Sequence, residues 1–164
     1  MEQVFVLHVE TGWGSMVNEV SSGILNFILG GKSEFSILQD STSRLGSIDI
    51  RYRVIVSDKN KNLYFVYTEC NNSRIMKYHG YLAYSNSGIN FYRGKAKISD
   101  GEFNEKAVKG LQWVLSMLFS GSELPSVVHV LHHGRCSRCG RKLRDAESLM
   151  CGLGPECRKK VGFR

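Results

Sequence analysis

The sequence lacks the patterns that mark membrane-bound and exported proteins. No apolar run approaches the roughly 18 residues that a membrane-spanning helix needs, so we expect no transmembrane segment. The first residues carry neither a basic stretch nor a small-residue cleavage site, so we expect no signal peptide. Closely spaced cysteines without such a signal favour metal binding over disulfides. The sequence therefore predicts a protein of a reducing compartment, the cytoplasm.

Catalytic signatures are missing as well. None of the five histidines pairs with a carboxylate at a recognised catalytic spacing. The run Gly30-Gly31-Lys32-Ser33 is similar to the end of a phosphate-binding loop, but Asn26 stands where that loop requires glycine. Cys70 is a lone cysteine at the end of an expected strand, and such cysteines are more often structural than nucleophilic. We therefore expect a protein that is not an enzyme.

Negative charge is scarce at one end of the chain. Residues 1–128 carry 13 Lys and Arg against 12 Asp and Glu, whereas residues 129–164 carry 9 against 3. Nearly all of the net charge of +7 therefore lies on the C-terminal segment. A compact basic surface attracts phosphate backbones or acidic protein surfaces.

The apolar pattern predicts an α+β fold. Helical spacing of apolar residues predicts helices over residues 16–29 and 104–118. Short runs rich in β-branched and aromatic residues, separated by polar turns, predict an antiparallel meander. The expected strands are residues 4–9, 34–38, 48–56, 63–68, 74–83, 89–93 and 127–131. We expect an α+β domain of unknown role over residues 1–128 and a basic zinc-binding module, of zinc-knuckle or treble-clef type, over residues 129–164.

Four of the five cysteines lie within 22 residues, at Cys136, Cys139, Cys151 and Cys157. A Cys-x2-Cys pair followed by two further cysteines has the spacing of a structural metal site. Zinc accepts four thiolates, or three thiolates and one imidazole, in a closed tetrahedron. Gly140 suits the turn after the pair, and Pro155 suits the first turn of a helix. The spacing therefore predicts a Zn²⁺ site.

The fourth ligand has more than one candidate. Cys151 would complete an all-thiolate site from nearby residues. His132 is the rival because it precedes Cys136 by four residues at the end of an expected strand, and His133 is a third option. The alternative without metal is a set of free thiols, or a disulfide between Cys151 and Cys157.

The same segment resembles a known family. Residues 134–143, 147–148 and 152–157 follow the pattern Cys-x2-Cys-Gly-Arg-x-Leu, Glu-Ser and Gly-x-Gly-Pro-x-Cys. This pattern is similar to a small zinc-finger-like domain of unknown function that is common in bacteriophage and prophage proteins. The expected helix over residues 104–118 is also similar to what precedes the motif in phage proteins. The resemblance implies a phage or mobile-element protein that works in a bacterial cell, and it implies no activity.

The resemblance also implies a ligand set. Members of the family usually offer three cysteines, which match Cys136, Cys139 and Cys157. A histidine often stands shortly before the first cysteine, and His132 matches it best. Cys151 departs from the family pattern, so both residues remain candidates for the fourth position.

Two functions fit the basic segment, and the first is nucleic-acid binding. A zinc scaffold that holds Arg and Lys rigidly is suited to phosphate contacts. The residues that we expect to make these contacts are Arg135, Arg138, Arg141, Lys142, Arg158 and Lys159. Tyrosines and phenylalanines of the strands offer base stacking, although strand alternation favours a place for them in the sheet core.

The second function is protein interaction. A compact phage protein without catalytic residues is suited to binding and inhibiting a host enzyme or a defence complex. Its basic face would then dock on an acidic host surface. The partner would be a host protein complex instead of nucleic acid, and the sequence predicts no oligomeric state for either function.

Overall fold

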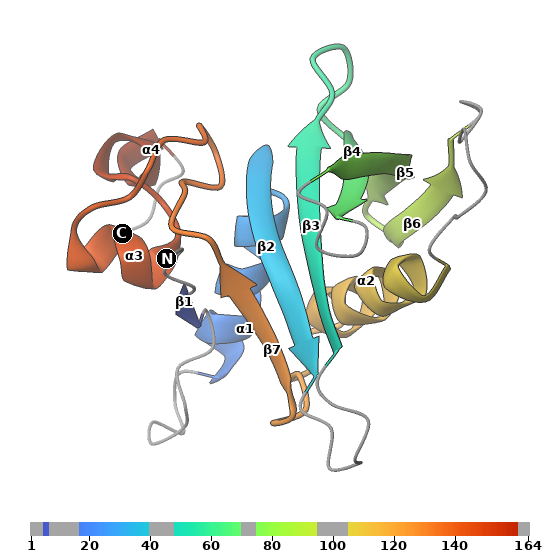
Figure 1. Ribbon diagram of the computed structural model, residues 1–164, viewed down its shortest axis with the longest axis horizontal. Helices are drawn as coiled ribbons and strands as arrows, with labels where there is room; N and C mark the ends of the chain where they lie inside the picture. Colours follow the sequence, from blue (N-terminus) through green and yellow to red (C-terminus); the bar gives the residue numbers. More distant parts are fainter. Residues whose placement is uncertain (1–4, 7–16, 40–47, 70–74, 95–104, 161–164) are drawn as a thin grey trace.

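The computed structural model describes residues 5–6, 17–39, 48–69, 75–94 and 105–160 of the chain. These residues form an α+β fold, in which one antiparallel sheet is combined with a few helices (Figure 1). The predicted fold class is therefore confirmed at this level. Cys70 and His8 lie outside the described residues.

The sheet has seven strands in the order β1-β7-β2-β3-β4-β5-β6, and every neighbouring pair is antiparallel. Its long central strands follow one another as hairpins, as the alternating apolar segments and polar turns predicted. The strands are β1 (Phe5–Val6), β2 (Lys32–Gln39), β3 (Ile48–Val56), β4 (Leu63–Glu69), β5 (Met76–Ser85), β6 (Gly88–Arg93) and β7 (Val128–His132).

Two helices and one sheet face enclose the core. Helix α1 (Val17–Ile28) and helix α2 (Glu105–Phe119) occupy the two segments with helical spacing. The Tyr52 hydroxyl donates a hydrogen bond of 2.7 Å to the Ala107 carbonyl and so ties the sheet to α2. The buried residues include Ile24, Phe27 and Ile28 of α1, Leu111, Val114, Leu115 and Leu118 of α2, and Phe35, Tyr52, Val54, Val66, Leu82, Val128 and Val130 of the sheet.

The aromatic residues of the strands are divided between the two faces of the sheet. Tyr64 and Phe91 pack against the core, as strand alternation predicted. Their strand neighbours point the other way, and their rings form pairs across the strands. These pairs are Phe65 with Tyr78, Tyr67 with Tyr78, and Tyr81 with Tyr92. The core therefore takes only part of the aromatic set.

β7 occupies a place that local sequence patterns do not indicate. It follows α2 along the chain, yet it lies between β1 and β2. Its ladder with β2 runs from Phe35 opposite His132 to Gln39 opposite Val128. β7 is thus part of the sheet, and the chain leaves it directly into the cysteine-rich segment (Figure 1).

The cysteine-rich segment folds into a short hairpin and two short helices. A β-bridge between Arg135 and Lys142 closes the hairpin. Helix α3 (Ala146–Cys151) begins where Asp145 accepts a hydrogen bond of 2.9 Å from the Ser148 N–H, which is a standard N-cap. Helix α4 (Pro155–Lys160) begins at Pro155, as the sequence predicted.

Candidate metal centre

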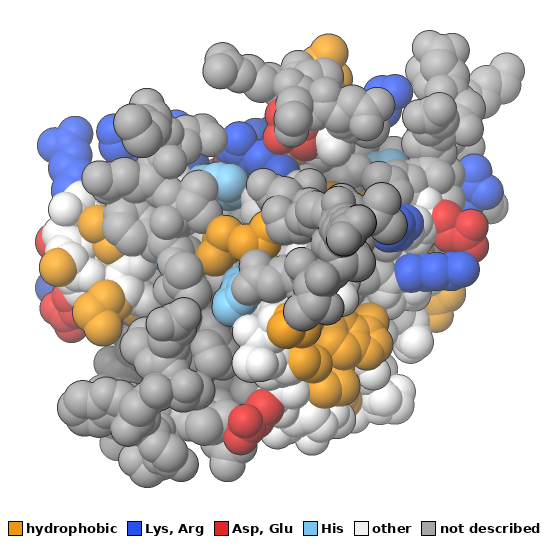
Figure 2. Space-filling model, turned by 60° about the horizontal axis from the view of Figure 1, so that its bottom comes forward, with side chains coloured by type: hydrophobic (Ala, Val, Ile, Leu, Met, Phe, Trp, Pro, Cys, Tyr) orange, Lys and Arg blue, Asp and Glu red, His pale blue; other side chains and the backbone are white. Residues whose placement is uncertain are grey.

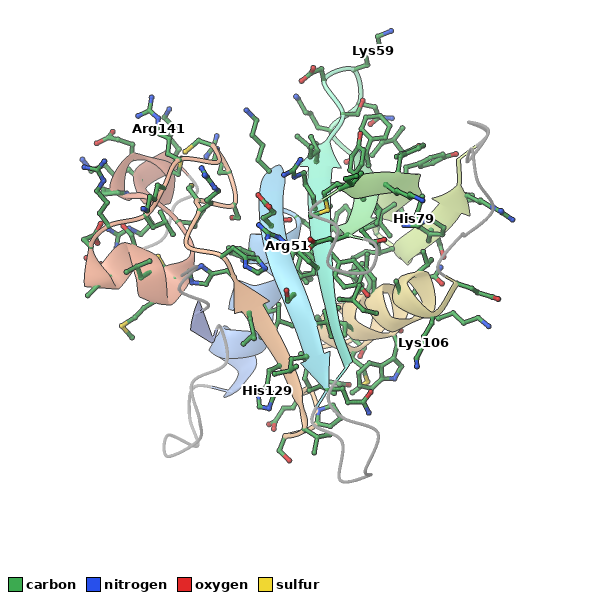
Figure 3. The ribbon with its side chains drawn as sticks, in the orientation of Figure 1. Arg51, Lys59, His79, Lys106, His129 and Arg141 are labelled. Carbon is green, nitrogen blue, oxygen red and sulfur yellow. The ribbon has the colours of Figure 1, made fainter. Side chains whose placement is uncertain are left out.

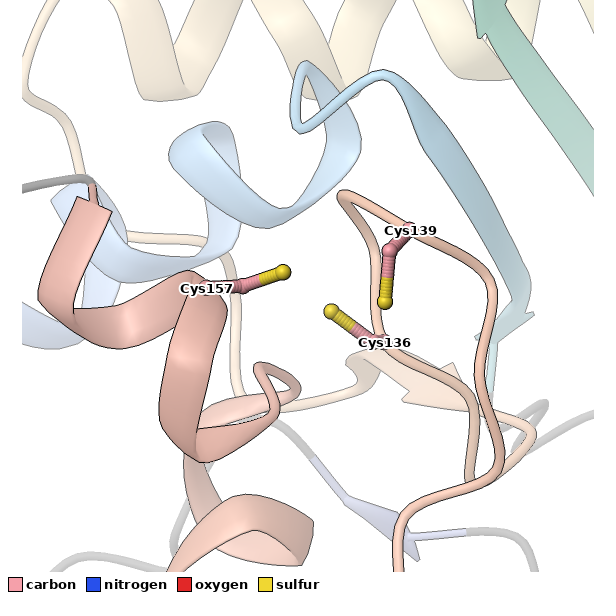
Figure 4. A group of neighbouring side chains, drawn as sticks. All are labelled: Cys136, Cys139 and Cys157. Carbon is pink, nitrogen blue, oxygen red and sulfur yellow. The ribbon is translucent and has the colours of Figure 1, made fainter.

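Three cysteine side chains converge in the C-terminal module, which is the name used here for residues 129–164. Cys136 and Cys139 bound a tight turn, the knuckle (residues 136–139), which a hydrogen bond of 2.9 Å from the Gly140 N–H to the Cys136 carbonyl closes. Gly140 has φ of 78°, a conformation that favours glycine. Cys157 lies in the first turn of α4 and faces the knuckle (Figure 4). The three Sγ atoms lie within 4.8 Å of one another.

The geometry of these thiols fits a tetrahedral metal ion. Thiolates that bind zinc at about 2.3 Å lie about 3.8 Å apart, and a spacing within 4.8 Å is compatible with that value. Cys136 and Cys157 are buried, and Cys139 is half-buried. Among the described residues, these three cysteines are the one group of Cys, His, Asp and Glu side chains that meets at metal-binding distance. The site can therefore hold a metal ion.

The electrostatics of the three-cysteine cluster also suit a cation. Burial raises the pKa of Cys136, but hydrogen bonds from the backbone N–H groups of Gly154, Cys139 and Arg138 outweigh it and hold the pKa below its ordinary value. Burial, together with the two neighbouring thiols, raises the pKa of Cys157 to about 11. One thiolate is thus stabilised by the protein, whereas a full set of three needs a positive charge between them.

The two candidates for a fourth ligand make other contacts. The Cys151 thiol donates to the carbonyls of Leu153 and Ser148, at 3.5 and 3.8 Å. His132 is fully buried, its Nε2 lies 2.6 Å from the Leu149 carbonyl, and its Nδ1 accepts a hydrogen bond of 3.1 Å from the Gly134 N–H. His132 thereby joins the end of β7 to α3.

The third option, His133, also has a partner elsewhere, because its Nε2 lies 3.0 Å from the Ser36 hydroxyl of β2. The structure thus brings together three of the five predicted ligands. A ligand role for Cys151 or His132 stays a prediction.

The knuckle is docked on the connection between α1 and β2, which passes beside it in Figure 4. The Ser137 side chain is fully buried, and the Ser137 carbonyl accepts a hydrogen bond of 2.6 Å from the Lys32 N–H. A Cβ on Gly30 would lie 2.9 Å from the Ser137 carbonyl oxygen and closer still to the Ser137 hydroxyl. Glycine at position 30 therefore permits the contact. This is the role that the structure gives to Gly30.

A basic groove of about 460 Å³ lies beside the cysteine cluster. Cys139 and Cys157 form part of its wall, and four cationic residues line it against two acidic ones. The cations are Arg141, Lys142, Arg144 and Lys160, and the acids are Asp145 and Glu156. Arg141 points away from the body of the protein in Figure 3. Arg144 and Lys160 belong to the basic runs but were not among the predicted contacts.

The other predicted basic residues have different surroundings. Arg158 is only 16% exposed and forms an ion pair of 2.6 Å with Glu147, so it is engaged within the module. Lys159 is exposed and lies 3.5 Å from Glu156. Arg135 donates to the Gly140 carbonyl, and Arg138 is exposed. Figure 2 shows Lys and Arg side chains, in blue, at the left of the molecule, where Figure 1 places the module.

Comparison with known proteins reaches only this part of the chain. A family of unknown function (DUF6011) matches residues 127–162, which include the cysteine cluster and both short helices. No curated protein and no solved structure matches the chain. A search of the described helices finds none that is both long and apolar enough to cross a membrane.

Proposed function

We propose that the protein binds zinc and contacts nucleic acid through the C-terminal module, without catalysing a reaction. The proposal includes the phage setting and the bacterial cytoplasm that the sequence resemblance implies. Cys136, Cys139 and Cys157 would hold the ion, with Cys151 or His132 as the fourth ligand. The hairpin, α4 and the converging thiols together support a knuckle of treble-clef type. Zinc would supply a fixed cross-link, which a module of this size needs to fold.

The observation that carries the nucleic-acid proposal is the basic groove beside the cysteine cluster. Arg141 and Lys142 lie on the hairpin and Lys160 lies on α4, the two elements that the cluster joins, while Arg144 lies between the hairpin and α3. A metal ion would therefore hold these side chains at fixed positions. Fixed guanidinium and ammonium groups bind phosphates with less loss of side-chain entropy than mobile ones. Arg158 is left out of this surface because Glu147 already pairs with it.

The test is the salt dependence of oligonucleotide binding. We expect the zinc-loaded protein to bind a fluorescent ten-nucleotide single strand and a 20-base-pair duplex in anisotropy titrations. Changing Arg141 and Lys142 together to Gln should weaken binding to both. If both residues contact phosphates, the slope of log K against log salt for the single strand should also fall by about 1.4, because each contact contributes about 0.7.

The matched control changes Lys106 and Lys109 of α2 to Gln. This double variant loses the same charge from exposed positions outside the module. We expect its slope to equal that of the unchanged protein. Equal slopes for all three proteins would disprove phosphate contact by Arg141 and Lys142, and with it the proposed role of the basic groove. Absence of oligonucleotide binding would remove the proposed function and favour the protein-interaction alternative.

A further inference from the structure

A second and larger groove lies between the C-terminal module and the sheet. Its volume is about 1020 Å³, and its walls come from the end of α1, the base of the β3–β4 hairpin and the knuckle. We call it the junction groove. Lys32, Lys61 and Arg138 line it against a single acidic residue, Asp58. The lining therefore carries an excess of positive charge.

The junction groove is also lined by aromatic rings. Tyr64, Phe65 and Tyr84 line the junction groove, and Tyr84 is 39% exposed. Tyr84 packs edge-on against Phe119 of α2, with the ring centroids 6.1 Å apart. This contact fixes one side of the Tyr84 ring. Rings that are anchored on one side and exposed on the other offer flat surfaces for stacking.

The junction groove depends on the docking of the knuckle. Arg138 lies inside the knuckle, between two of the clustered cysteines, and Lys32 donates its backbone N–H to Ser137. The same contact thus places one cation from the module next to one cation from β2. Lys61 belongs to the β3–β4 hairpin, which forms another wall of the groove. In Figure 3, Arg141 of the module and Lys59 of the hairpin point toward the same side of the molecule.

We propose that the junction groove binds a segment of single-stranded nucleic acid. Lys32, Lys61 and Arg138 would contact its phosphates, while the exposed ring of Tyr84 would stack on a base. The inference rests on the proposed function and extends it to a second surface. It also specifies the form of the nucleic acid, because bases in a duplex are stacked on each other and expose only their edges to a groove.

The chemistry favours this occupant over an acidic protein segment. A row of phosphates needs cations, and unpaired bases need flat apolar surfaces; the lining of the junction groove offers both. An acidic peptide would use the cations and leave the exposed ring of Tyr84 without a matching group. Two probes of ten nucleotides, oligothymidine and oligouridine, distinguish binding of DNA from binding of RNA.

The first experiment compares two lysines of one loop. Lys61 lines the junction groove, whereas Lys59 lies two residues away and does not. We expect Lys61→Glu to reduce the affinity for both ten-nucleotide probes by at least fivefold, whereas Lys59→Glu should reduce it less than twofold. Both variants change the charge of the same exposed loop, so a long-range effect would appear in both.

The second experiment compares two exposed tyrosines. Tyr84 lines the junction groove, whereas Tyr92 is 48% exposed and stacks on Tyr81 outside the groove. We expect Tyr84→Ala to weaken single-strand binding by about fivefold or more, since one stacked base contributes at least that factor. Tyr92→Ala should leave it unchanged. Binding of the 20-base-pair duplex should be the same for both variants, and thermal melts check that both fold.

The outcomes separate this inference from the proposed function. If the Arg141 and Lys142 variant binds more weakly but Lys61→Glu equals Lys59→Glu and Tyr84→Ala equals Tyr92→Ala, the junction groove is disproved and the proposed function remains. If Tyr84→Ala weakens duplex binding equally, stacking on unpaired bases is disproved. If the protein binds no oligonucleotide but binds a ten-residue oligoglutamate in a manner that depends on Lys61, both proposals fail and the groove belongs to an acidic protein.

Discussion

At the scale of single residues, Gly30 decides whether the knuckle can dock on the sheet. We predict that Gly30→Ala destabilises the protein by about 1–3 kcal/mol, because the added methyl group would overlap Ser137, whose side chain is fully buried. Urea unfolding followed by circular dichroism measures the change. The same variant should bind oligonucleotides more weakly, because Arg138 would lose its place beside Lys32.

Gly23 of α1 provides the control for that substitution. Apart from its chain neighbours and the backbone of its own helix, no atom of the described residues lies within 4 Å of the position that its Cβ would take. Gly23→Ala should therefore stabilise the protein by about 0.5–1 kcal/mol through helix propensity alone. Two variants with the same change in stability would show that the contact between Gly30 and the knuckle does not matter.

The outcome at Gly30 also shows where sequence reasoning stops. A Gly-Gly pair after a helix indicates an unusual backbone conformation, and the sequence excluded a phosphate-binding loop because Asn26 stands where that loop requires glycine. The actual requirement is space for Ser137, which lies more than a hundred residues further along the chain. Local patterns carry no information about a contact of that kind, because the two partners are matched in shape and not in sequence.

At the scale of elements, the helices and most strands follow from periodicity. The strand from Ile48 to Val56 and the helix from Glu105 to Phe119 were predicted to within one residue. The three clustered cysteines were also found from their spacing, because a Cys-x2-Cys pair followed by further cysteines is typical of a structural metal site. The position of β7 in the sheet was not predictable, because strand pairing at long range leaves no local pattern.

The position of β7 changes what metal removal should do. The sequence placed a boundary after residue 128, yet β7 continues to His132 and bonds to β2. We predict that a chelator exposes the amides of residues 136–160 to hydrogen exchange and leaves those of β7 protected. Mass spectrometry of peptic peptides measures both. Loss of protection in β7 together with α4 would show that residues 129–164 unfold as one unit, as the sequence alone suggested.

At the scale of the whole molecule, the two proposed ligands meet at the knuckle. The metal ion would bind Cys136 and Cys139. The single-stranded nucleic acid would contact Arg138, which lies between these two cysteines in the sequence. Binding of either ligand should therefore favour binding of the other, and the two coupling factors must be equal because free energy does not depend on the order of binding. The sheet takes part in this coupling, since Lys32 holds the knuckle in place.

We predict that the zinc-loaded protein binds the ten-nucleotide probe at least fivefold more tightly than the metal-free protein. A saturating amount of probe should raise the zinc affinity by the same factor, measured by competition with a coloured chelator. Lys61→Glu should reduce both factors together, because it weakens the binding of the nucleic acid only when the knuckle is docked on the sheet. If zinc and the probe leave each other's affinity unchanged, the nucleic acid binds away from the knuckle, and the module and the sheet act independently.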